Sequence, residues 1–169
     1  MASKKMEKAL NKQINAELYS SYLYAAMAAY FDSKSLDGFA QWMKMQAQEE
    51  LVHAQKIYAY VNDVGGRVTM EAIEKPPAGF GTPLKAFEAA LKHEKHVTSL
   101  INKLVDLARS ESDHATDAFL QWFVTEQVEE EANAAKIVDD LKMVGDAPHG
   151  LFMLDKQLGA RGGPSGEED

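Results

Sequence analysis

The stretch that decides the fold is FAQWMKMQAQEELVHAQKIYAYVNDV, residues 39–64. One stripe of this stretch recurs every three or four residues, which is typical of a helix that packs one face into a core. Its members are Phe39, Met43, Gln46, Glu50, His53, Ile57, Tyr60 and Val64. A carboxylate and an imidazole, Glu50 and His53, therefore fall in the middle of the core-facing stripe. Burying a carboxylate there costs free energy unless a cation meets it.

Three further segments carry the same helical periodicity. They are residues 5–31, 83–108 and 113–143. Each has a polar interruption near the middle of its stripe; these residues are Glu17, then Glu94, then Gln127 with the neighbouring Glu130. No segment shows the alternation of a half-buried strand. The sequence therefore predicts an all-α protein built on a four-helix bundle.

The connections predict how the helices are arranged. Residues 32–34 are too few for anything but an antiparallel hairpin of the first two helices, and the same holds for the last two. Residues 65–81 form a much longer link. About 17 residues can span roughly 56 Å, more than the length of about 42 Å of a 28-residue helix. This link is either a long crossover, which makes the second and third helices parallel, or a loose surface loop, and its apolar residues favour the crossover.

The ends of the segments carry capping signals. Ser35 and Ser112 are expected to cap the second and fourth helices, and Thr82 followed by Pro83 begins the third. A short fifth helix is expected after Pro148. We expect one domain over residues 1–158, followed by a flexible acidic, glycine-rich tail over residues 159–169.

Composition narrows the classes of function. The net charge is -8, which disfavours nucleic acid or an anionic membrane as partner. The longest apolar run, residues 22–31, is too short to span a bilayer, and residues 1–13 show no apolar signal segment. A cytoplasmic location is therefore expected. The chain has no cysteine, which excludes disulfides, thiolate metal sites and a cysteine nucleophile.

The polar residues of the four stripes form a set of metal ligands. One imidazole among several carboxylates is a hard, oxygen-rich donor set, which matches iron or manganese better than a thiolate-rich zinc site does. Two divalent ions would neutralise most of the charge of the four carboxylates, which are Glu17, Glu50, Glu94 and Glu130. Glu50, on the same face as His53, is the natural bridging ligand. Tyr24 lies seven residues after Glu17 on the same stripe, so its hydroxyl is expected near the site.

Each piece also has a simpler interpretation. A single mid-stripe glutamate is more often an edge residue that reaches water, and a lone Glu-x-x-His is a weak motif. His53 alone would more often be a core histidine, and the acidic run at residues 126–131 would usually be a solvated helix face. The metal interpretation is favoured because four independent stripes are interrupted at one level.

The chain resembles the prokaryotic non-haem ferritins from about Glu7 to Leu158. The matching segments are NAELYSSYLY (15–24), QEELVHA (48–54), FEAALKHE (87–94) and FLQWFVTEQVEEE (119–131). This resemblance implies a ferritin-like four-helix bundle with a short fifth helix, assembled as a homo-oligomeric cage of twenty-four subunits. It also implies ferroxidase activity, in which dioxygen or hydrogen peroxide oxidises Fe(II), and storage of Fe(III) as hydrated ferric oxide inside the cage.

The resemblance also assigns roles to residues. It implies that Glu17, Glu50 and His53 bind a first iron, with Glu50 bridging. Glu94 and Glu130 complete a second iron site, with Gln127 beside it. The resemblance places a third iron site next to this pair; its residues are Glu49, Glu126, Glu129 and Glu130. It places Tyr24 beside the centre, where it supplies an electron, so Tyr24 and Glu50 are the expected catalytic residues.

The chain departs from related families in informative ways. Val52 stands where haem-containing relatives place a haem-ligating methionine, so no haem site is expected. The fourth helix carries Gln127-x-x-Glu130 in place of a second Glu-x-x-His. Two other functions stay open from the sequence: a discrete di-iron peroxidase or oxygenase without mineral storage, and a structural bundle whose site has degenerated.

Overall fold

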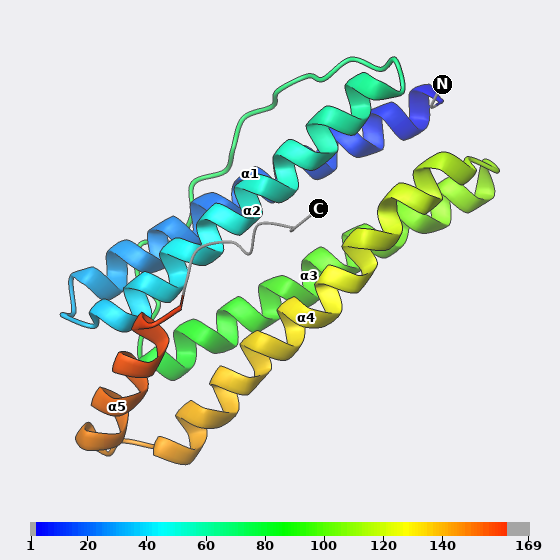
Figure 1. Cartoon of the computed structure of the whole chain (residues 1–169). Coiled ribbons are helices and arrows are strands. Elements are labelled where there is room, and N and C mark those ends of the chain that lie inside the picture. Colours follow the sequence, from blue (N-terminus) through cyan, green and yellow to red (C-terminus); the bar gives the residue numbers. More distant parts are fainter. Residues whose placement is uncertain (1–2, 162–169) are drawn as a thin grey trace.

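The protein is described by a computed structural model over residues 3–161. This part of the chain forms five helices, which are α1 (Lys4–Asp32), α2 (Asp37–Asp63), α3 (Pro83–Ser110), α4 (His114–Val144) and α5 (Pro148–Gly159). The four long helices lie side by side, and the short α5 packs at one end (Figure 1). The prediction of an all-α four-helix bundle with a fifth C-terminal helix is confirmed. Within residues 3–161 no helix is long and apolar enough to cross a membrane.

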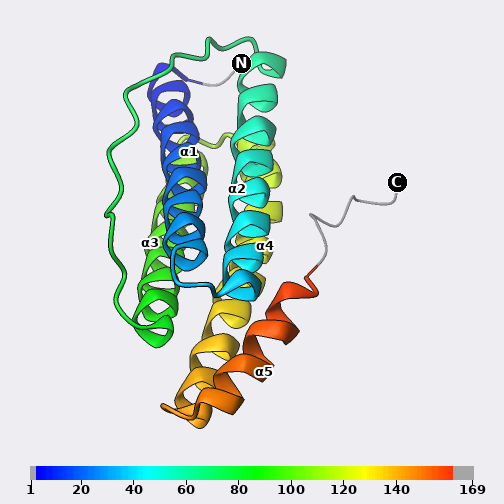
Figure 2. The same ribbon diagram turned by 90° about the vertical axis from the view of Figure 1, so that its left-hand side faces the viewer.

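The link between α2 and α3 runs the length of the bundle along α1 (Figure 2). The Asn11 side chain fixes its first part, because Nδ2 donates to the Arg67 carbonyl at 2.9 Å and Oδ1 accepts from the Thr69 amide at 2.8 Å. Its last part is held by Tyr30, whose hydroxyl donates to the Gly81 carbonyl at 2.7 Å. The link is therefore an ordered crossover, and α2 and α3 run parallel.

Two apolar clusters fill the two ends of the bundle. One contains the rings of Phe31, Phe39 and Phe87, whose centroids lie 5.3–6.1 Å apart. The other, at the opposite end, includes Leu10 and Phe123. Burying each such side chain contributes about 1.5–3 kcal/mol. The polar residues of the four stripes occupy the level between these clusters, so apolar packing on both sides holds them in place.

The start of α2 is capped from another helix. Ser35, the predicted cap, adopts a left-handed conformation with φ 56° because it turns the chain between two helices. Leu36 takes the cap position and makes no side-chain cap bond. Instead Asp155 of α5 accepts from the amides of Gly38 and Phe39 at 2.9 and 3.0 Å. The prediction for Ser35 was wrong, because the cap is a tertiary contact.

The cap of α4 also lies one residue after the predicted position. Ser112 has φ 55° in the link between α3 and α4, so it cannot cap α4. Asp113 does so, and its carboxylate accepts from the Thr116 amide at 3.1 Å. The predicted start of α3 is confirmed, since Thr82 Oγ1 accepts from the Lys85 amide at 3.2 Å.

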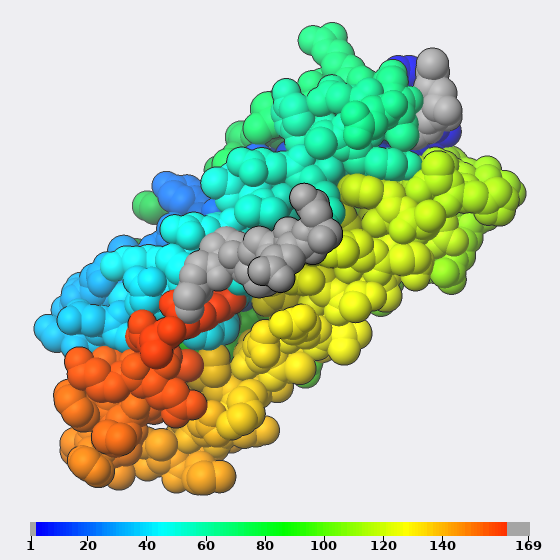
Figure 3. All heavy atoms as spheres, viewed as in Figure 1, coloured from blue at the N-terminus to red at the C-terminus, as the bar shows by residue number. Residues whose placement is uncertain are grey.

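The contact of α5 with α2 is close enough to require glycine. A Cβ atom on Gly38 would lie 1.6 Å from the Asp155 carbonyl oxygen. Figure 3 shows α5 packed against the beginning of α2 and the end of α4. α5 continues to Gly159, one residue past the expected end of the domain. Residues 162–169 of the expected tail lie outside the described residues.

We expect Asp155→Ala to lower the free energy of unfolding by about 1–2 kcal/mol, the usual cost of losing a side-chain cap. Asp155→Asn keeps a carbonyl oxygen that accepts from the same amides, so it should lose much less. Thermal or denaturant unfolding of the two variants beside the unmodified protein measures the difference. Equal losses in both variants would show that the carboxylate charge, and not the cap, stabilises this contact.

Candidate metal centre

Six side chains from four helices meet at the middle of the bundle. They are Glu17 of α1, Glu50 and His53 of α2, Glu94 of α3, and Gln127 and Glu130 of α4. All six are buried, with exposed fractions of 4% or less. The structure therefore places every polar interruption of the four stripes at the level that the sequence predicted.

One compact group lies between α1 and α2. The ligand atoms of Glu17, Glu50 and His53 all lie within 4.8 Å of one another. Glu50 Oε2 is 3.3 Å from His53 Nδ1. Within residues 3–161, Glu17 Oε2 and Glu50 Oε2 are the buried side-chain oxygens that have no hydrogen-bond partner. Buried polar atoms are nearly always satisfied, so two unsatisfied carboxylate oxygens beside an imidazole fit a bound cation.

The Glu94 carboxylate is held by two neighbours. The Tyr24 hydroxyl donates to Glu94 Oε1. Gln127 Nε2 lies 3.3 Å from Glu94 Oε2 and 3.2 Å from the Glu94 carbonyl oxygen. Tyr24 is fully buried, and burial followed by the charge of Glu94 raises the pKa of its phenol. The tyrosine therefore stays protonated and keeps donating to this carboxylate.

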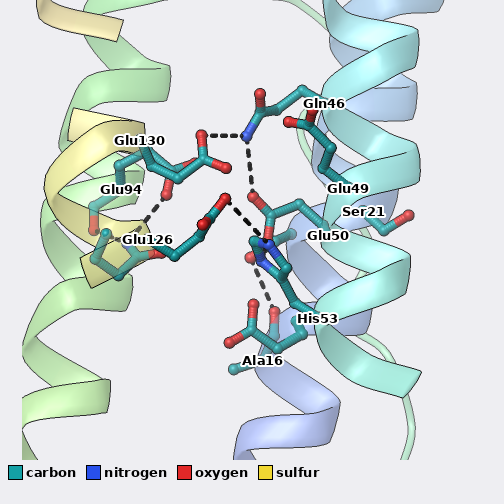
Figure 4. Close-up of polar contacts among 12 residues, drawn as sticks. Ala16, Ser21, Gln46, Glu49, Glu50, His53, Glu94, Glu126 and Glu130 are labelled. Atoms are coloured by element: carbon teal, nitrogen blue, oxygen red, sulfur yellow. Dashed lines mark hydrogen bonds and ion pairs between the residues drawn. The ribbon is translucent and has the colours of Figure 1, made fainter. Parts of the chain in front are cut away.

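Gln46 connects the two sides of the site, a role that the sequence did not reveal. Its Nε2 donates to Glu130 Oε2 at 2.7 Å and to Glu50 Oε1 at 3.2 Å (Figure 4). The only sequence signal was its position on the α2 stripe, four residues before Glu50. An amide on that stripe is also common as an ordinary buried residue, so the pattern gave it no role.

A second group lies beside the first, toward α4. The ligand atoms of His53, Glu126 and Glu130 lie within 4.8 Å of one another, and His53 Nε2 is 4.0 Å from Glu126 Oε1. Figure 4 shows Glu126 and Glu130 pointing from α4 toward α2. Burial raises the pKa of Glu126, and the carboxylates of Glu129 and Glu49 raise it further. Of the four residues expected at a third site, Glu126 and Glu130 thus lie in one group with His53, and Glu49 and Glu129 act on Glu126 through their charge.

The charges of the buried carboxylates act on one another. Burial raises the pKa of Glu17, and Glu50 adds to the effect. Burial also raises the pKa of Glu50, with contributions from Glu94 and Glu130. For Glu130, burial and then the charge of Glu94 raise the pKa to about 8. The cluster therefore holds protons that a divalent cation would displace.

Comparison with known proteins identifies the family. The family model described as a ferritin-like domain matches residues 7–144. The chain belongs to the ferritin family. The resemblance drawn from the sequence is thereby confirmed, and so is the predicted function, iron storage with ferroxidase activity.

Individual relatives match over almost the whole chain. The bacterial non-heme ferritin of Bacteroides fragilis is 49% identical over 95% of this chain and 100% of its own length. The bacterial non-heme ferritin of Staphylococcus aureus is 42% identical over 95% of this chain and 97% of its own length. Among solved structures, an engineered closed form of the Archaeoglobus fulgidus ferritin is 52% identical, with a TM-score of 0.96 over 96% of this chain and 99% of that one. The open-pore ferritin of the same archaeon matches with a TM-score of 0.95, again over 96% of this chain and 99% of that one.

The raised pKa of Glu130 predicts how the metal-free protein responds to pH. An unfolded chain loses this proton above its ordinary pKa of 4.5, whereas the folded chain keeps it up to about 8. The folded state binds more protons between these values, so its stability falls as pH rises through this window. We expect the unfolding temperature of chelator-treated protein to decrease over that range, and Glu130→Gln to reduce the decrease.

The control is Glu88→Gln, because Glu88 is an exposed glutamate of α3. This variant should keep the full decrease of the unfolding temperature with pH. An unfolding temperature that rises with pH in the unmodified protein, or that changes equally in Glu130→Gln, would contradict the assignment of the bound proton to the buried cluster.

Proposed function

We propose that two Fe(II) ions bind at the middle of the bundle and are oxidised there. The ligands are Glu17, Glu50 and His53 for one ion, and Glu94 and Glu130, with Glu50 shared, for the other. The observation that carries the proposal is the pair of buried oxygens of Glu17 and Glu50 that lack a hydrogen-bond partner and lie beside the His53 imidazole. Hard carboxylate oxygens with one imidazole are a donor set that suits iron.

Glu50 has the surroundings of a bridging ligand. Its Oε2 lies on the His53 side, at 3.3 Å from Nδ1. Its Oε1 accepts from Gln46, the same amide that binds Glu130. The Glu50 carboxylate thus has one oxygen on the side of His53 and the other on the side of Glu130. Gln127, through Glu94, fixes the second half without carrying charge.

The chemistry of oxidation comes from the substrates. Dioxygen or hydrogen peroxide accepts electrons from the two ferrous ions, and the protein holds the ions together and neutralises their charge. We propose that Tyr24 supplies a further electron from its ring while its phenolic proton passes to the Glu94 oxygen that it contacts; this contact supports the proposal. Gln46 and Gln127 keep the carboxylates oriented, and burial keeps bulk water out.

A third Fe(II) is proposed to bind next to this pair. Glu130 would be shared with the dinuclear centre, and the remaining ligands would be Glu49, Glu126 and Glu129. The electrostatic effect of Glu49 and Glu129 on Glu126 supports the grouping. Oxidised iron is then stored as hydrated ferric oxide in a hollow assembly. Homo-oligomeric cage assembly follows from the ferritin structures that this chain matches, and we propose twenty-four subunits. Consistent with Val52, we propose no haem site.

We expect Glu50→Ala to slow the initial rate of aerobic Fe(II) oxidation by at least about tenfold, because the shared ligand is lost. The same change should leave the metal-free protein equally or more stable, since it removes a buried charge from a repulsive cluster. Stopped-flow absorbance and thermal unfolding measure the two effects. Glu88→Ala, on the exposed face of α3, is the matched control and should change neither. An unaltered oxidation rate in Glu50→Ala would overturn the assignment of the centre.

Storage is tested separately from oxidation. Under excess Fe(II) in air, the intact assembly should retain far more iron than two ions per chain, and the retained iron should be a ferric mineral. Size-exclusion chromatography followed by iron determination on the protein peak makes the measurement. Recovery of only about two ions per chain, with oxidation intact, would indicate a discrete di-iron redox enzyme instead.

A further inference from the structure

Arg161, just beyond α5, reaches back to the metal centre. Its Nη2 lies 2.5 Å from Glu49 Oε2, and its Nη1 donates to Gln46 Oε1 at 2.9 Å. The guanidinium also lies over the Trp42 ring, 4.5 Å from the centroid, and donates to the Trp42 carbonyl at 3.3 Å. The side chains of Arg161 and Glu49 are only 21% and 20% exposed. This contact is thus more enclosed than an ordinary surface ion pair.

The two groups that Arg161 holds both belong to the iron chemistry. Glu49 is a proposed ligand of the third iron. Gln46 donates through Nε2 to Glu50 and Glu130. Because Gln46 Oε1 accepts from Arg161, the amide nitrogen must face the carboxylates. One guanidinium therefore binds a ligand of the third site and orients an amide of the dinuclear centre.

The reach of Arg161 is set by the packing of α5. Asp155 binds the amides that begin α2, and the chain around Gly159 lies against Gly38, where an added Cβ on Gly159 would be 3.1 Å from the Gly38 Cα atom. These contacts hold the end of α5 against the side of α2 that carries Trp42, Gln46 and Glu49. The packing of α5 against α2 therefore brings Arg161 within reach of Gln46 and Glu49.

We propose that Arg161 is a latch on the third iron site. While that site is empty, the guanidinium serves as the counter-charge of Glu49, and a third Fe(II) binds by displacing it. An arginine stays charged at every working pH, so it competes with a cation under all conditions in which iron binds. The two ions of the dinuclear centre bind first, because the groups that hold their carboxylates, Gln46, Gln127 and Tyr24, are uncharged. The inference rests on the proposed third site.

Competition makes a specific thermodynamic prediction. Removing the guanidinium must raise the affinity of the third ion, because Glu49 then has no competing cation. Coupling of this kind typically changes an affinity by about tenfold. The first two ions should bind within about threefold of their normal affinity, since Glu50 and Glu130 still select the nitrogen side of Gln46.

The test is anaerobic titration of the assembled, full-length protein with Fe(II), followed by isothermal calorimetry. Arg161→Ala should tighten the third ion about tenfold. Arg161→Lys keeps the positive charge and should stay within about threefold of the unmodified protein. Lys44→Ala is the matched control: it removes a positive charge from a surface ion pair between α2 and α1, in which Lys44 Nζ lies 3.0 Å from Asp32 Oδ2, and it should change none of the three affinities.

The outcomes separate the latch from the proposed function. Two tight ions with a third that is unaffected by Arg161→Ala would overturn the latch alone. An equal effect of Arg161→Ala and Arg161→Lys would also overturn it, because it would show a structural role and not competition between charges. Failure of every protein to bind two ions per chain would overturn the dinuclear centre itself.

Discussion

Four carboxylates buried together at one level of the bundle impose the constraint to which the rest of the structure responds. Each is withdrawn from water, and the charges of Glu50, Glu94 and Glu130 raise the pKa of neighbouring carboxyls, so the cluster opposes folding in the absence of cations. The two apolar clusters on either side, packed around rings such as Phe39 and Phe123, supply the stabilisation that offsets this cost. The same arrangement makes the site selective, since a divalent cation relieves a repulsion that the fold already contains.

The uncharged donors around the carboxylates shape the site. Gln46, Gln127 and Tyr24 satisfy oxygens on Glu50, Glu94 and Glu130 without adding positive charge. Lysines or arginines in those places would satisfy the same oxygens but would compete with iron. The oxygens left without a partner lie on the side of His53. The proposed binding of two ferrous ions and release of ferric iron is served by ligands that are oriented but not neutralised.

The fifth helix contributes contacts on which the start of α2 depends. Asp155 provides the cap that α2 lacks, and Gly38 allows the approach that makes this possible. Arg161 then places a positive charge at Glu49, on the outer side of the cluster. Uncharged donors thus hold the buried carboxylates of the proposed dinuclear centre, whereas a guanidinium holds Glu49 of the proposed third site, so the two proposed sites offer iron different conditions for binding.

The sequence by itself determined the helices, their order and the level at which the polar residues meet, because period and spacing are local properties of a chain. Glu17, Glu50, His53 and Glu94 could be found this way, since each interrupts an apolar stripe. The sequence did not reveal the roles of Gln46, Asp155 and Arg161, and it placed the caps of α2 and α4 at Ser35 and Ser112, each one residue before the cap position in the structure. Only the tertiary structure decided the roles of Gln46, Asp155 and Arg161, because each depends on a contact between segments that are distant along the chain. No periodicity records which side chain of α5 will lie against the start of α2.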